Sequence, residues 1–160
     1  MKLSQNFTLA EMVGSQVATR RGIDNRAPMW AIERLADLAT EILQPVRDRF
    51  GPVTVTSGWR CQALERALKG RPEGWRSESQ HSRGEAADFE VRGRSNLEVA
   101  RWIEAALPFD QLILEFYEPP DPNSGWIHCS YVRPPRGVAM QALRQGGGVA
   151  YIRGLPQEPS

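Results

Sequence analysis

The chain contains two histidines, and both lie in sequence contexts that favour metal binding. His81 opens the octet 81–88, which has the pattern His-x-x-Gly-x-Ala-x-Asp and ends at Asp88. His128 lies in the middle of the largely apolar run 126–130. Two imidazoles and one carboxylate make three protein ligands, which leave the fourth position of a tetrahedral zinc ion open for water. The sequence therefore predicts one Zn2+ per chain, held by His81, Asp88 and His128.

The strands expected around these residues bring a further acid to the same side. Side chains alternate between the two faces of a strand, so in the expected strand 126–132 His128 faces away from its apolar neighbours. In the expected strand 111–117 the same alternation separates Glu115 from three apolar side chains that we assign to the core. If these strands pair, Glu115 and His128 share a face, and Asp88 can point to it as well. Glu115 is therefore a candidate general base.

The other elements predict the framework of the fold. Capping boxes predict helices that begin after Thr8 and Ser95, and a longer helix from Met29 should be kinked or ended by Pro45. A loop is expected at 20–28 and a short helix at 61–69, with strands at 53–56, 86–91, 111–117, 126–132, 138–143 and 149–152. Helices come first and strands later, which predicts an α+β fold with a mainly antiparallel sheet and flanking helices. We expect one domain over residues 1–153 and a frayed tail over 154–160.

Composition limits the classes of partner. The net charge of +1 provides no basic field for nucleic acid. No segment approaches the roughly 20 apolar residues that span a bilayer, so we expect no membrane partner. The first residues lack the apolar core of a signal peptide, so synthesis in the cytoplasm is expected. Two cysteines are too few for a disulfide framework, and Cys129 is expected in the core. We expect a monomer.

Three short motifs together resemble the zinc D-Ala-D-Ala carboxypeptidase family. They are Ser-Gly-Trp-Arg at 57–60, the segment 79–88 that contains the octet, and Trp-Ile-His at 126–128. That family also includes phage and bacterial L,D-endopeptidases of peptidoglycan and D,D-dipeptidases, and the Hedgehog signalling domain shares its fold. The resemblance covers about residues 7–132, and segments 7–12 and 43–47 resemble the phage-type branch. It implies the same three zinc ligands.

The resemblance also implies roles for residues near the expected metal. Arg60 matches an arginine that the family uses on the substrate or the transition state; a salt bridge within its own loop is the alternative. Ser79 and Gln80 match positions near the site and are candidates for substrate binding. Trp59 is a candidate for lining a substrate groove, with ordinary packing as the alternative.

The catalytic base is where this sequence departs from many members of the family. They carry Glu or Asp three residues before the last histidine ligand, and Gly125 occupies that position here. Glu115 is our choice of base, because its placement is similar to that of the acidic residue in the Hedgehog domain. Glu118 and Asp121, in the following loop, are the alternatives.

We therefore expect a zinc peptidase that cuts peptidoglycan stem peptides, as a carboxypeptidase or an L,D-endopeptidase. The absence of a leader in the sequence fits a phage or prophage lysis enzyme that acts on the cell wall after release or from a virion. One alternative is an intracellular D,D-dipeptidase or carboxypeptidase with the same chemistry. Another is a zinc-binding phage structural module without activity, which the missing acid at Gly125 would explain.

Overall fold

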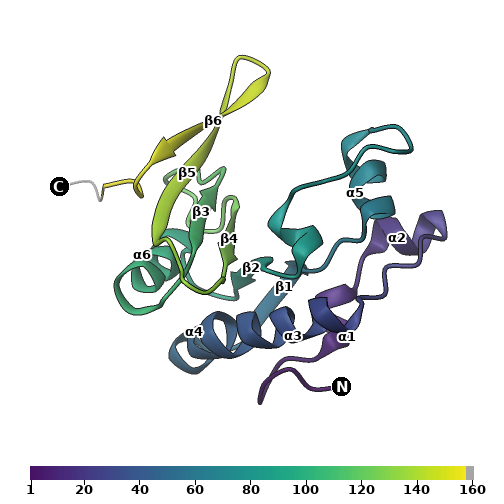
Figure 1. Ribbon diagram of the computed structural model, residues 1–160. Helices are drawn as coiled ribbons and strands as arrows, with labels where there is room; N and C mark the ends of the chain where they lie inside the picture. The colour runs from purple at the N-terminus through teal and green to yellow at the C-terminus, as the bar shows by residue number, and fades with distance from the viewer. Residues whose placement is uncertain (158–160) are drawn as a thin grey trace.

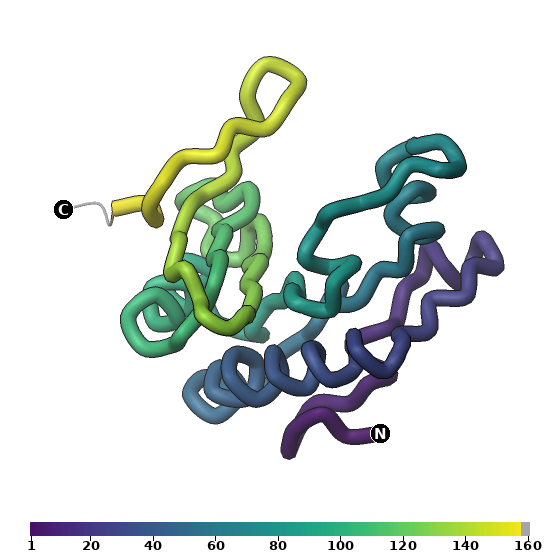
Figure 2. The backbone as a smooth tube through the Cα atoms, viewed as in Figure 1, coloured from purple at the N-terminus to yellow at the C-terminus, as the bar shows by residue number. Residues whose placement is uncertain are grey.

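The α+β fold with a mainly antiparallel sheet is confirmed in a computed structural model, which describes residues 1–157. Six strands form one sheet in the order β1-β2-β4-β3-β5-β6, and the β3–β5 pair is the parallel exception. The strands are β1 (Val53–Ser57), β2 (Ala86–Val91), β3 (Gln111–Glu115), β4 (Trp126–Ser130), β5 (Val138–Gln145) and β6 (Gly148–Arg153). Helices of the first half of the chain lie along one side of the strands, and the β5–β6 hairpin projects on the other (Figure 1 and Figure 2).

The helices mostly follow the expected pattern. They are α1 (Leu9–Val13), α2 (Gln16–Arg21), α3 (Met29–Leu38), α4 (Gln44–Phe50), α5 (Gln62–Lys69) and α6 (Asn96–Ala106). The capping box at Thr8 is formed in both directions, since Thr8 and Glu11 each accept from the other's backbone. Helix α2 was not predicted, and it shortens the loop expected from residue 20. It is delimited by the Ser15 cap and by Gly22 in left-handed conformation.

The regular part of the long helix ends before Pro45, as predicted, and a π-helical turn carries the chain on into a further helix. The regular part of α3 ends at Leu38, and a π-helical turn, Ala39–Leu43, joins it to α4. Proline has no N–H and its ring crowds the carbonyl one turn earlier, so a wider turn before it relieves the conflict. The whole segment still presents apolar side chains to the core, including Leu35, Leu38, Ile42 and Leu43.

The core lies on one face of the sheet and leaves the other face for polar residues. Phe89, Leu112, Leu114 and Ile127 are fully buried and pack with the apolar sides of the helices. Cys129 belongs to this cluster, as predicted from its position in the strand, and burial raises the pKa of its thiol. Because neighbouring residues in a strand point to opposite faces, the residues between these apolar ones emerge on the second face.

The tail predicted to fray from residue 154 is packed as far as Pro156. The backbone N–H of Gly154 donates to the carbonyl of Ala139 at 2.8 Å. Leu155 packs against the core, and Arg101 donates to the carbonyl of Pro156. Residues 158–160 of the predicted tail lie outside the described residues. Among the helices that the structure describes, none is both long enough and apolar enough to cross a bilayer.

Gly125 is required by a close backbone approach at the start of β4. Its φ is +68°, and a Cβ atom there would lie 1.9 Å from the carbonyl oxygen of Glu115. Phe116, directly after β3, also has a positive φ of 53°. The backbone of the β3–β4 connection therefore excludes any side chain at this position, which explains why an acid cannot stand there.

Gly125→Ala should lower the free energy of unfolding by at least about 3 kcal/mol, because backbone strain and a steric clash act together. Gly137→Ala is the matched control. Its φ is +67°, but a Cβ atom there would meet nothing within 4 Å. The control should cost only about 1 kcal/mol, from the left-handed backbone alone. Urea unfolding of both variants measures the difference, and equal losses would contradict the close approach.

Candidate metal centre

The structure brings His81, Asp88 and His128 together at one point. Asp88 on β2 is directly paired with His128 on β4 in the antiparallel register. His81 lies in the 3₁₀ turn Gln80–Arg83, just before β2, and Gly84 ends that turn in left-handed conformation. One potential ligand atom from each residue lies within 4.8 Å of the others, and all three residues are buried. The predicted ligand set therefore forms a cluster that could hold a metal ion.

Hydrogen bonds orient the two imidazoles toward Asp88. His81 Nδ1 lies 2.7 Å from the carbonyl oxygen of Gly58, which can only accept, so Nδ1 carries the proton and Nε2 has the free lone pair. Asp88 Oδ1 lies 3.3 Å from His81 Nε2 and 3.0 Å from His128 Nδ1. His128 Nε2 is buried with no hydrogen-bond partner among the described residues. Two nitrogens and one oxygen thus converge, and this donor set fits zinc.

Asp88 is held in its ionised form. Burial alone would raise the pKa of its carboxyl group, but the two adjacent imidazoles, with His128 Nδ1 as a hydrogen-bond donor, together outweigh burial and hold the pKa well below its usual range. A metal ligand must be deprotonated, so the carboxylate is already in the form that binds a cation.

Arg60 binds the carboxylate oxygen of Asp88 that the two histidines do not contact. Its guanidinium donates to Ser57 Oγ at 2.8 Å, to Glu65 Oε1 at 3.4 Å and to Asp88 Oδ2 at 3.1 Å. The side chain is only 19% exposed, so most of its surface is buried. Arg60 borders the cavity above the cluster. Its ion pairs reach Glu65 on α5 and Asp88 on β2, rather than a partner within its own loop, and its role toward a substrate stays a prediction.

Glu65 is a component of the site that sequence reasoning missed. It is fully buried on α5 and pairs with Arg60 and, one helical turn on, with Lys69 Nζ at 2.5 Å. Burial would raise the pKa of Glu65, but the hydrogen bond and charge of Lys69, together with Arg60 and Ser77, outweigh it and lower the pKa. Ser77, in the loop before His81, donates its hydroxyl to the same carboxylate. The available signal was an acid on the apolar side of a helix with a lysine four residues later.

Glu115 faces the metal cluster from β3. Its neighbour Ile113 is paired with His128, and Glu115 itself is paired with Trp126, so the predicted alternation is confirmed as far as Glu115. Phe116, expected in the core, lies outside it and packs against Trp126, because its positive φ ends the strand. Burial raises the pKa of the Glu115 carboxyl group. Glu118 and Asp121 are exposed in the following loop and do not line the cavity. The position of Glu115 therefore suits the predicted role of base better than either alternative.

A cavity of about 320 Å³ lies over the cluster. Its lining residues are Arg60, Ser79, Gln80, His81, Asp88, Gln111, Ile113, Glu115, Trp126, His128 and Tyr151. Ser79 and Gln80 are therefore at the site, as predicted. Gln80 Nε2 donates to Asp110 at 2.9 Å. A hydrogen bond from Arg136, with help from Gln80, lowers the pKa of Asp110 to about 2.

Trp59 does not line this cavity, but it borders a second cavity that Arg60 also lines, so its place in a substrate groove stays a prediction. The side chain is 5% exposed and belongs to the core cluster. It packs edge-on against Trp30, with ring centroids 5.7 Å apart. The backbone N–H of Trp59 donates to the carbonyl of Met12 at 2.7 Å. Ordinary packing, the alternative considered from sequence, accounts for these contacts.

Residues 5–130 match the family model described as Peptidase M15. The chain belongs to the M15 peptidase family. This family includes D-Ala-D-Ala carboxypeptidase and consists of zinc peptidases, so membership implies a zinc metallopeptidase. The cluster of His81, Asp88 and His128 in this M15 domain is able to hold the ion. The chain matches no curated protein sequence.

Asp88→Ala should abolish zinc binding to this M15 domain, because it removes the anionic ligand and leaves two histidines. Elemental analysis after dialysis should find about one zinc per chain in the wild type and almost none in the variant. Glu90→Ala, two residues along β2, is the control and should keep its zinc. A chelator should lower Tm of the wild type and leave that of Asp88→Ala unchanged. Retention of zinc by Asp88→Ala would contradict the ligand set.

Glu65→Gln should weaken zinc binding by about ten-fold, because second-shell partners of a metal ligand typically have effects of this size. The variant keeps the shape of the side chain but removes the negative charge that pairs with Arg60, which in turn binds Asp88. Competition with a chelator of known affinity measures the change. Glu98→Gln, which breaks the exposed ion pair between Glu98 on α6 and Arg94 before the helix, is the control and should bind zinc like the wild type. Lower stability with unchanged zinc affinity would assign Glu65 a purely structural role.

Proposed function

We propose that this M15 domain is an endopeptidase that hydrolyses the stem peptides of peptidoglycan. The observation that carries the proposal is a metal cluster and a carboxylate of raised pKa that line one cavity. The resemblance of the sequence to phage and bacterial L,D-endopeptidases supports peptidoglycan as the substrate. We further propose that the enzyme serves phage or prophage lysis and meets the wall after release or from a virion.

The residues of the site suit hydrolysis of a peptide bond. Zinc in such a site supplies Lewis acidity, which polarises a carbonyl group and acidifies water. Glu115 takes the proton from the attacking water and then delivers it to the nitrogen of the leaving amine. Burial raises the pKa of Glu115, so its conjugate acid donates this proton at near-neutral pH more readily than an exposed carboxyl group would. Arg60 keeps Asp88 in place through the cycle.

The charge of the cavity favours an internal bond over a C-terminal one. A carboxypeptidase needs a cation for the free carboxylate of its substrate. Among the described residues that line the cavity, Arg60 is the one lysine or arginine. Its nitrogens already donate to Ser57, Glu65 and Asp88. A free carboxylate would also lie close to Glu115 and be repelled, so an uncharged peptide on both sides of the scissile bond fits better.

Digestion of purified peptidoglycan, with mass analysis of the fragments, tests the proposal. The wild type should release soluble stem fragments with new termini inside the peptide. Glu115→Gln should keep its zinc and lose activity by about 10²–10⁴-fold, the usual contribution of a general acid–base group. Glu118→Gln, in the exposed loop, is the matched control and should stay active.

Two outcomes would overturn parts of this proposal. Release of only the terminal D-alanine would assign carboxypeptidase activity. If a zinc-loaded wild type releases nothing, the domain is a zinc-stabilised binding module and the enzyme proposal fails.

A further inference from the structure

The β5–β6 hairpin lies outside the segment that matches the family model, yet it forms part of the site. The match ends at residue 130, and β5 begins at Val138. β5 continues the sheet by pairing in parallel with β3, and β6 pairs with β5 and forms the edge of the sheet. The hairpin therefore extends the face that carries Glu115.

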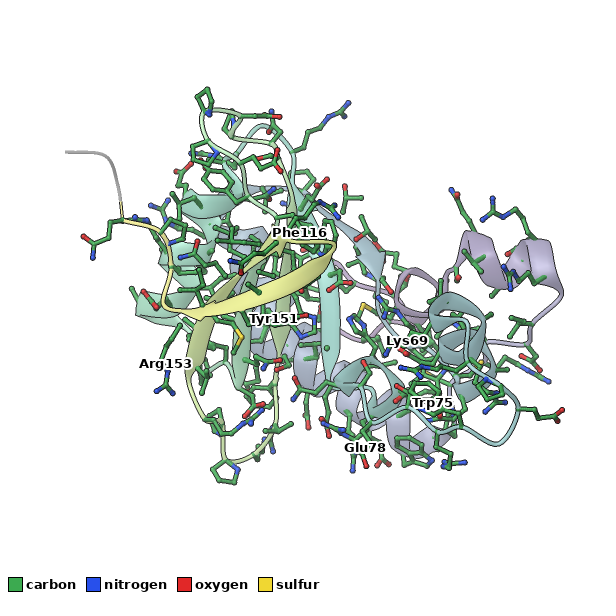
Figure 3. The ribbon with its side chains drawn as sticks, turned by 90° about the horizontal axis from the view of Figure 1, so that it is seen from above. Lys69, Trp75, Glu78, Phe116, Tyr151 and Arg153 are labelled. Carbon is green, nitrogen blue, oxygen red and sulfur yellow. The ribbon has the colours of Figure 1, made fainter. Side chains whose placement is uncertain are left out.

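The strand register aligns Tyr151 with the proposed catalytic base. Glu115 is paired with Trp126 on one side and with Ala142 on the other, and Ala142 is paired with Tyr151. Directly paired residues project to the same face of a sheet, so these four side chains form one row across four strands. Tyr151 is labelled in Figure 3, on the hairpin strand drawn in yellow. The row sets an aromatic residue on each side of Glu115.

Ala142 leaves room for Tyr151 to reach the cavity. Ala142 is fully buried and has only a methyl side chain between Glu115 and Tyr151. Tyr151 is 61% exposed, yet it lines the same cavity as the metal cluster and Glu115. A large aromatic side chain that borders a cavity while staying largely exposed has a surface left for contact with a ligand.

The hydroxyl group of Tyr151 is an available hydrogen-bond donor. It forms no hydrogen bond within the described part of the chain, whereas Arg60 and Gln80 in the same cavity already donate to carboxylates. Partial burial, together with the nearby charge of Glu115, raises the pKa of the phenol, so the hydroxyl stays protonated. A peptide offers carbonyl oxygens as matching acceptors.

We propose that Tyr151 is a substrate-binding residue of this peptidase. Its ring packs against the peptide that runs from the metal cluster past Glu115 toward the β6 edge, and its hydroxyl donates to a peptide carbonyl. The exposed side chain of Val149, two residues away on the same face of β6, extends the apolar surface. This inference rests on the proposed function for the identity of the ligand, a stem peptide.

Steady-state kinetics on a soluble peptidoglycan stem peptide tests the inference. Tyr151→Ala should raise KM by about ten-fold with kcat changed by less than about three-fold, as expected for loss of an aromatic contact to a bound peptide. Tyr151→Phe should raise KM by a smaller factor, since only the hydroxyl is lost. Ile152→Ala is the control, because Ile152 is next to Tyr151 on β6, is also exposed, and points to the opposite face of the sheet. Zinc content should be unchanged in all three.

A binding measurement separates this inference from the proposed function. In a Glu115→Gln background, the dissociation constant for the same stem peptide should rise by about ten-fold when Tyr151→Ala is added, and should not change with Ile152→Ala. That result supports the inference even if the wild type proves unable to cleave. Equal affinities for the Tyr151→Ala and Ile152→Ala proteins, or no binding of the peptide at all, would overturn it.

Discussion

The antiparallel pairing of β2 with β4 is the constraint on which the candidate site depends. It sets Asp88 opposite His128, and with β3 on the other side of β4 it brings Ile113 and Glu115 onto the same face. Because side chains alternate along a strand, a shift of one residue would exchange this polar face for the apolar one. The buried side chains of Phe89, Leu112 and Ile127 fix the register, so the hydrophobic core determines where the metal ligands lie.

A buried network of charged side chains also helps to hold the metal ligand Asp88 in position. Glu65 has no exposed surface, and it joins Arg60 behind Asp88 to Lys69 on the same helix and to Ser77 in the loop before His81. An ionised carboxylate in the interior is stable only with partners of this kind. The network therefore links α5, the loop before the 3₁₀ turn and β2, and a change in any one of them reaches the metal ligands.

Residues whose role follows from local patterns could be predicted from sequence, while those that depend on packing between distant segments could not. Strand alternation correctly oriented His128 and Glu115, and capping residues located α1. The burial of Trp59 could not be predicted, because it depends on packing against Trp30, which lies far from it in the sequence. Tyr151 gave no signal, since its place beside Glu115 results from the parallel pairing of β3 with β5.

Gly125 illustrates how the structure changes the meaning of a sequence departure. In the sequence it is a missing acid and an argument against activity. In the structure it is the position where the β3–β4 connection passes close to the carbonyl of Glu115, so that no side chain fits. The same close approach holds the end of β3, from which Glu115 points into the cavity. The residue whose backbone excludes an acid at Gly125 is therefore Glu115, which itself supplies a carboxylate to the cavity.

X-ray absorption spectroscopy at the zinc edge, on protein purified without added metal chelators, tests the central claim most directly. The account predicts about one zinc per chain with nitrogen and oxygen ligands at about 2.0–2.1 Å, scattering from two imidazole rings and no sulfur shell. His81→Ala should remove one of the two imidazole contributions. A sulfur shell at about 2.3 Å, which only Cys61, Cys129 or a methionine could provide, would contradict a metal centre on His81, Asp88 and His128.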